Sequence, residues 1–174
     1  ENTLQLVRLA STNQALRRDW EAMEEIVGAG LARVRQRDPG RRIRSSVPEG
    51  LPLVKADPVL LAQLITNLLE NALKYSEGAV DLVVQVQAGE MRVAVKDRGE
   101  GIPDAEQATI FEPYARGDRA GPRGAGLGLA VCRAIAQAHG GRLVLRRRTG
   151  GGSSFVLSLP VEAQPLEEKE GRAP

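Results

Sequence analysis

The sequence predicts an α/β fold, a two-layer sandwich in which a mixed, mainly antiparallel sheet of four or five strands carries three helices on one face. Three observations support this prediction. The chain has three long stretches with helical periodicity, and two pairs of stretches in which apolar and polar residues alternate. Of its 174 residues, 42% are hydrophobic and only 3% are aromatic, so one large aliphatic core is expected.

The first 54 residues are predicted to contain helical segments and one strand. Residues 1–13 look helical but hold too few apolar residues for a core of their own. An amphipathic helix is expected over residues 19–37, and Asp38-Pro39-Gly40 is expected to end it. Residues 41–54 have the pattern of an edge strand followed by a loop that is interrupted by proline.

A long helix is predicted to begin at Asp57, a favourable N-cap, with Pro58 in its first position, and to run to about Tyr75. One side of this helix is apolar. The other side gathers polar residues, namely Gln63, Asn67, Glu70, Asn71 and Lys74. A solvated face is one interpretation of this cluster. Asparagine is a poor helix former, however, so two of them one turn apart point to a ligand that has oxygens and a metal ion.

The second half of the chain is predicted to supply two hairpins and the third helix. The strands are expected over residues 80–86, 91–96, 142–148 and 154–159. Residues 98–125 look rich in loops, and residues 127–139 are expected to form a helix that ends at Gly140-Gly141. Residues 161–174 are polar and contain proline, so a disordered tail is predicted.

Composition narrows the possible functions. The single cysteine, Cys132, excludes an internal disulfide framework and lies in an apolar helical run, where a structural thiol is expected. The single histidine, His139, has no neighbours at metal-ligand spacing. The basic clusters Arg41-Arg42 and Arg146–148 lack aromatic residues for base stacking, so no nucleic-acid partner is expected. We expect no membrane span or signal peptide, and the absence of an initial Met indicates a fragment of a longer protein.

Two glycine-rich segments carry residues that packing alone does not require. In the first, a predicted strand delivers Asp97 to a turn that contains Gly99 and Gly101. This carboxylate could accept hydrogen bonds from an exocyclic amine while the glycines admit a ring, although a capped tight turn is the alternative. The second segment, 124–128, opens a helix, where backbone N–H groups suit phosphates. Its spacing matches neither the Rossmann nor the Walker pattern.

Four segments occur together in a characteristic order. They are Asn67-x-x-x-Asn71-Ala72-x-Lys74-Tyr75, Asp97-x-Gly99-x-Gly101-Ile102-Pro103, Ile110-Phe111-Glu112-Pro113-Tyr114 and Gly124-x-Gly126-Leu127-Gly128-Leu129. This set resembles the N, G1, F and G2 boxes of the histidine-kinase catalytic domain over roughly residues 45–160. The resemblance implies a Bergerat-type ATP-binding fold.

Within this family the chain looks most like the Kdp-type potassium-responsive sensor kinases. The features that support this are Asp19-Trp20 followed by Glu24-Glu25-Ile26-Val27-Gly28, then Tyr114-Ala115-Arg116-Gly117, and the run from Gly126 to Ile135. Potassium or osmotic signalling is the expected context.

The resemblance implies roles for the residues that would surround the phosphates. Asn71 would ligate Mg²⁺, with Asn67 assisting directly or through water, and Lys74 would neutralise phosphate charge. Arg116 would reach the γ-phosphate from a mobile lid. The phosphate loop would consist of Gly124, Gly126, Leu127 and Gly128. Glu70 matches an acidic position of the family, where it would either polarise the reaction or act only as a helix-surface carboxylate.

The resemblance also implies how the nucleoside of ATP would be held. Tyr75 would lie against the adenine or its ribose, and Asp97 would accept a hydrogen bond from the adenine amine, with Ser153 helping through a water. The residues expected to give the base room are Gly99, Gly101 and Ile102.

The family's phosphoacceptor motif is absent, and His139 does not fit it. Residues 1–13 resemble the end of the dimerisation helix that carries that histidine, and residues 14–44 resemble a linker with the first helix and strand. The catalytic domain is expected over residues 45–160, and the disordered tail over residues 161–174. The expected partners are ATP, the dimerisation domain of the same parent protein and a response regulator. The fragment is expected to be a monomer and the cytoplasmic domain of a membrane-anchored, homodimeric parent.

Two other functions stay open. An ATP-hydrolysing clamp, like the related gyrase, mismatch-repair and chaperone ATPases, typically has a glutamate where Asn67 stands, so Asn67 argues against hydrolysis. A module that senses nucleotide without catalysis would carry the same binding residues.

Overall fold

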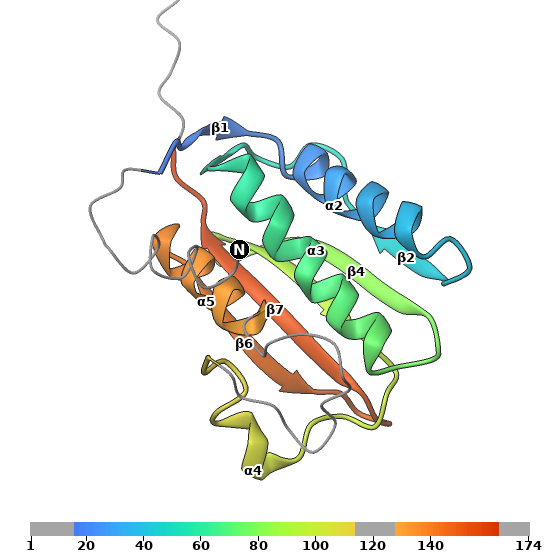
Figure 1. Cartoon of the computed structure of the whole chain (residues 1–174). Coiled ribbons are helices and arrows are strands. Elements are labelled where there is room, and N and C mark those ends of the chain that lie inside the picture. The colour runs from blue at the N-terminus through green and yellow to red at the C-terminus, as the bar shows by residue number, and fades with distance from the viewer. Residues whose placement is uncertain (1–15, 114–127, 164–174) are drawn as a thin grey trace, which may run out of the picture.

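The computed structural model describes residues 16–113 and 128–163, which form a sheet with helices packed on one of its faces (Figure 1). Within these residues the main sheet has five strands in the order β2-β4-β5-β7-β6. They are β2 (Ile43–Ser46), β4 (Val80–Gln87), β5 (Glu90–Lys96), β6 (Arg142–Arg147) and β7 (Ser153–Pro160). Only the pair β2–β4 is parallel in this sheet. The predicted mixed, mainly antiparallel sheet is therefore confirmed.

The second layer consists of the three predicted helices. In the described part of the chain they are α2 (Met23–Arg37), α3 (Pro58–Lys74) and α5 (Gly128–Ala138). The central helix α3 contacts both α2 and α5 (Figure 1). Asp57 sets its start, because Oδ1 accepts hydrogen bonds from the backbone nitrogens of Val59 (3.1 Å) and Leu60 (3.2 Å). This confirms the predicted N-cap.

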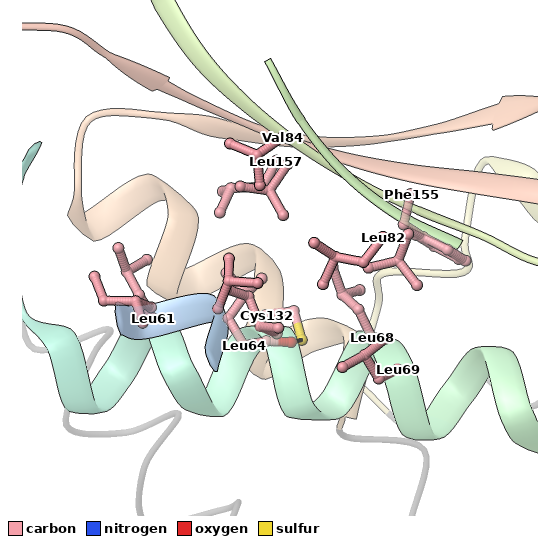
Figure 2. Packing of buried hydrophobic residues seen from close by; sticks show 14 of the residues in the cluster. Leu61, Leu64, Leu68, Leu69, Leu82, Val84, Cys132, Phe155 and Leu157 are labelled. Carbon is pink, nitrogen blue, oxygen red and sulfur yellow. Dashed lines mark hydrogen bonds between the residues drawn. The ribbon is translucent and has the colours of Figure 1, made fainter. Parts of the chain in front are cut away.

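The core between the layers is aliphatic, as predicted. Figure 2 shows leucines of α3 facing the sheet residues Leu82, Val84 and Leu157, with Phe155 and Cys132 beside them. The leucines of α3 that lose all exposure are Leu61, Leu64, Leu68 and Leu69. Burial of one such side chain contributes roughly 1.5–3 kcal/mol, so this row fixes α3 on the sheet.

A glycine allows α2 to approach α3 closely. A Cβ atom added at Gly30 would lie 2.9 Å from Cγ2 of Ile65, too close for two carbon atoms. The apolar side of α2 is buried against the core through Met23, Val27 and Val34. A larger residue at this crossing would therefore require Ile65 or one of the helices to shift.

The expected helix over residues 19–37 starts later than predicted. Asp19–Glu21 instead forms β1, which pairs antiparallel with β3 (Val54–Ala56) in a separate two-stranded sheet. The ammonium of Lys55 lies 5.8 Å from the centroid of the Trp20 ring across this pair. Both strands have only three residues, so neither has enough alternation to be found by pattern. Pairing with a distant segment overrides the helical spacing of Trp20.

The remaining differences are small. The loop-rich segment contains a short helix, α4 (Asp104–Gln107), that was not predicted. The prediction for residues 1–13 lies outside the described residues, as does most of the predicted tail. Of that tail, Val161 donates a backbone hydrogen bond to the carbonyl of Gly89 (2.9 Å). No helix in the described ranges is both long and apolar enough to cross a membrane.

Candidate functional site

The polar side of α3 is most developed near its C-terminal end. Asn67 and Asn71 are one turn apart and half-buried, and Lys74 is exposed at the last helical position. The backbone N–H of Tyr75 donates to the carbonyl of Asn71 (3.2 Å), which closes the last turn. The ammonium of Lys74 lies 5.3 Å from the centroid of the Tyr75 ring. Two amides, a cation and an aromatic ring therefore share one end of α3, as the sequence predicts.

The amides of this face have oxygens available for a cation. The side-chain nitrogen Nδ2 of Asn67 is buried and has no hydrogen-bond partner among the described residues. The side-chain oxygen Oδ1 is not buried in this way, and no described residue donates a hydrogen bond to it. The Asn71 side chain makes no hydrogen bond within the described ranges. Because Mg²⁺ prefers oxygen ligands and keeps several waters, two amide oxygens one turn apart fit this ion.

Glu70 faces a different neighbour. Its Oε1 forms an ion pair with Nη1 of Arg37, the last residue of α2. The side chains of Arg37 and Glu70 are 62% and 41% exposed, so solvent screens the pair and it contributes at most about 1 kcal/mol. The contact agrees with the interpretation of Glu70 as a helix-surface carboxylate.

Asp97 lies directly after β5 and is 6% exposed. Its Oδ1 accepts hydrogen bonds from the backbone nitrogens of Gly99 (2.9 Å) and Ser153 (3.2 Å). The guanidinium of Arg148 donates to the carbonyl oxygen of Asp97 (2.7 Å). Within the described residues, both hydrogen bonds to the carboxylate end on Oδ1, so Oδ2 is available to a ligand. The backbone therefore fixes the orientation of a buried carboxylate.

Two glycines bring three distant segments together around this carboxylate. A Cβ atom at Gly99 would lie 2.4 Å from the carbonyl oxygen of Tyr75, so the turn after β5 touches the end of α3. Gly152, before β7, has a φ of 93°, and a Cβ there would lie 2.2 Å from the carbonyl oxygen of Asp97. No larger residue fits either place without a shift of the backbone. Tyr75, Asp97 and Ser153 therefore converge, as the family resemblance implies.

The other predicted site residues are only partly described. Gly101 has a φ of 80° in the same turn, and Ile102 packs on the edge of the core. Gly128 is the first residue of α5, and a Cβ atom there would meet nothing within 4 Å. The predicted residues outside the described ranges are Arg116, Gly124, Gly126 and Leu127.

Sequence reasoning missed arginines that support the site. Arg148 holds the Asp97 carbonyl. Arg98 donates to the carbonyl of Ala79 and to Oδ2 of Asp81 (2.6 Å). The motifs do not indicate these contacts, because an arginine that binds a distant backbone carbonyl requires no particular residue at the position of its partner. In the sequence, Arg148 stands out only as part of the basic cluster 146–148.

Cys132 and His139 are both structural. The Cys132 thiol is fully buried in α5, and burial raises its pKa to about 12 although the nearby Asn67 side chain acts in the opposite direction. The His139 ring is 4% exposed, with Nδ1 2.8 Å from the carbonyl oxygen of Ile135. Its Nε2 accepts a hydrogen bond from the backbone N–H of Asp57 (3.0 Å), so Nδ1 carries the proton. Both ring nitrogens are engaged, which joins the end of α5 to the start of α3.

We expect the stability of the fold to fall in acid through His139. Burial lowers the pKa of His139 from 6.5 and outweighs the hydrogen bond to the Ile135 carbonyl and the charge of Asp57, which both raise it; Arg18 lowers it further. Protonation would also remove the acceptor for the Asp57 N–H. The stabilisation is thus complete above the unfolded-state pKa near 6.5 and is lost as the pH falls below it. The free energy of unfolding in urea would be measured as the pH is lowered. It should fall more in the wild type than in His139→Gln, whose side chain cannot titrate. Equal losses would contradict this role.

Comparison with known proteins points to one family. The model of the family described as histidine kinase-, DNA gyrase B-, and HSP90-like ATPase matches residues 56–163. The chain is 37% identical to sensor protein KdpD of Escherichia coli (strain K12) over 173 residues, which cover 96% of the chain and 19% of that protein. The chain therefore spans about a fifth of the length of this relative.

Solved structures show the same fold. Full-length ShkA in complex with AMPPNP has a TM-score of 0.79 and 30% identity, with 95% of the present chain and 36% of that chain covered. The mycobacterial sensor histidine kinase MprB has a TM-score of 0.71 and 28% identity, with 82% and 97% covered. The match therefore accounts for nearly the whole of that MprB chain.

Proposed function

Because the chain belongs to the histidine kinase-, DNA gyrase B-, and HSP90-like ATPase family and carries a catalytic domain of the histidine-kinase type, we propose that it transfers the γ-phosphate of ATP to a histidine on a separate dimerisation domain. The observation that carries this proposal is the helix face with Asn67 and Asn71. An amide cannot act as the general base that hydrolysis of ATP by water needs. The carboxylate on this helix, Glu70, is paired with Arg37. Transfer to a protein histidine is therefore favoured over an ATP-hydrolysing clamp.

The proposed nucleoside site is built on Asp97. Its Oδ2 would accept a hydrogen bond from the exocyclic amine of adenine, and Ser153 would add a contact through water. Tyr75, at the end of α3, would lie against the adenine or the ribose. We also propose that Gly99 and Gly101 leave room for the base beside Asp97. This arrangement would bind ATP and ADP alike, since both carry the same base.

The proposed phosphate site lies along α3. Asn71, with Asn67, would hold Mg²⁺, which when bound neutralises charge that develops on the transferred phosphoryl group. Lys74 would contact the phosphates from the last turn of the helix. We also propose phosphate contacts from Arg116 and from the segment 124–128. Together these groups orient the triphosphate for attack.

The nucleophile must come from another domain. His139 is the single histidine of the chain, and both of its ring nitrogens are engaged in the core. We therefore propose a dimerisation domain of the same parent protein as the acceptor, followed by the aspartate of a response regulator. On the similarity to KdpD we also propose potassium or osmotic signalling. A membrane-anchored, homodimeric parent whose cytoplasmic part holds this domain completes the proposal.

Phosphotransfer in trans tests the proposal. The chain would be incubated with Mg²⁺ and ATP labelled on the γ-phosphate, with and without the dimerisation domain of the parent. Label is expected on the added domain and none on this chain. Acid-labile label on this chain that disappears in His139→Gln would overturn the two-part arrangement. Binding of ATP without any transfer would favour a nucleotide-sensing module instead.

A further inference from the structure

Arg41, in the turn between α2 and β2, reaches across to the end of α3. Its Nη1 donates to the carbonyl of Leu73 (2.8 Å), and its Nη2 donates to the carbonyls of Ser76 (2.6 Å) and Gly78 (3.3 Å). The last carbonyls of a helix have no partners within the helix and carry a partial negative charge. The planar guanidinium of Arg41 therefore binds three carbonyls between the last turn of α3 and the start of β4.

The bound carbonyls bracket two residues of the proposed site. Lys74 and Tyr75 lie between Leu73 and Ser76, so the fork of Arg41 holds the backbone on both sides of them. The carbonyl oxygen of Tyr75 in turn lies directly against Gly99.

The contacts continue to the buried carboxylate. The backbone N–H of Gly99 donates to Oδ1 of Asp97. Arg98 holds the chain further along, because its guanidinium donates to the carbonyl of Ala79. The segment from 73 to 79 is therefore clamped between two guanidinium groups, and its position determines where Tyr75 stands relative to Asp97.

We propose that Arg41 is a positioning residue for the nucleotide. Its side-chain hydrogen bonds within the described residues go to backbone carbonyls and not to Asp97 or to the side chains of Asn67 and Asn71, and it lies outside all four motifs of the site. By fixing the last turn of α3 and the residues that follow, it sets the distance between the group that contacts the phosphates, Lys74, and the groups that contact the base, Tyr75 and Asp97. This inference rests on the proposed function, because it requires that these three residues bind one ligand.

The neighbouring Arg42 offers a matched control. It is exposed, and its side chain makes no hydrogen bond or ion pair within the described residues. Removal of Arg42 changes the net charge by the same amount as removal of Arg41 but leaves the carbonyls of Leu73, Ser76 and Gly78 satisfied. Arg41→Lys keeps the charge but loses the planar fork, because a single ammonium cannot bind the three carbonyls with the same geometry.

Calorimetry with Mg-ATP and with ADP tests the inference in the wild type, Arg41→Ala, Arg41→Lys and Arg42→Ala, at a temperature where circular dichroism shows each to be folded. Arg41→Ala should weaken both nucleotides about tenfold, Arg41→Lys should lie between it and the wild type, and Arg42→Ala should stay within about twofold of the wild type. Without nucleotide, the amide resonances of Tyr75 and Gly99 should shift in Arg41→Ala and not in Arg42→Ala.

The outcomes separate this inference from the function on which it rests. Wild-type affinity in folded Arg41→Ala would overturn the positioning role while leaving the proposed function intact. If Arg41→Ala does not fold, wild-type affinity in Arg41→Lys overturns it in the same way. A wild type that binds neither nucleotide would instead overturn the proposed function.

Discussion

Replacement of Asn71 by alanine is expected to abolish the Mg²⁺-dependent binding of ATP. Asn71 lies one turn after Asn67 and three residues before Lys74, on a face where the amide oxygens have no protein donor within the described residues. Mg²⁺ holds few protein ligands and dehydrates reluctantly, so loss of one ligand is not readily compensated. Calorimetry with and without Mg²⁺ measures the effect. An unchanged affinity would remove Asn71 from the site.

The same helix supplies a control for this measurement. Val59 is 75% exposed in the first turn of α3, about 18 Å from Asn71 at a rise of 1.5 Å per residue. Val59→Ala should leave the affinity for Mg-ATP at the wild-type value. Weaker binding in both variants would indicate a general effect on α3 rather than the loss of a metal ligand.

Asp97→Ala should weaken ATP and ADP to the same extent. Loss of a buried, charge-assisted hydrogen bond costs on the order of 2 kcal/mol, which is about thirtyfold in affinity. Asp97→Asn distinguishes the contact with the ligand from the contacts within the turn. Its oxygen can still accept hydrogen bonds from Gly99 and Ser153, while an amide nitrogen replaces Oδ2. We expect a similar loss of affinity in this variant, since two donors would then face each other.

The control for this pair is Asp104, an acid whose side chain is 80% exposed and paired with Arg147. Asp104→Asn should bind both nucleotides as the wild type does. If Asp97→Asn left the affinity for ADP unchanged, Asp97 would not contact the base. A loss limited to ATP would assign Asp97 to the surroundings of the γ-phosphate, which ADP lacks.

The parts of the fold that could be predicted are those with strong local signals. α3 has an N-cap, a proline in its first position and an unbroken apolar stripe, and its predicted bounds agree with the structure. β1 and β3 could not be predicted, because three-residue strands gain their stability from each other rather than from their own residue pattern.

The candidate site shows the same division. Asp97, Ser153 and Tyr75 could be placed together because they lie in motifs that resemble those of the histidine-kinase catalytic domain. Arg41 and Arg148 could not, because their partners are carbonyl oxygens, which every residue has. A contact with a backbone group constrains only one of the two residues involved, and the sequence shows no pairing.

The burial of Cys132 has a consequence for how the protein can be studied. A thiolate is the reactive form, and this thiol has both a pKa of about 12 and no exposed surface, so alkylating reagents cannot modify the closed protein. Because it is the single cysteine of the chain, any modification occurs at this position and reports on openings, local or global, that expose the inner face of α5. The rate of labelling in native buffer therefore measures how often this part of the core opens, and it does so without a probe being introduced.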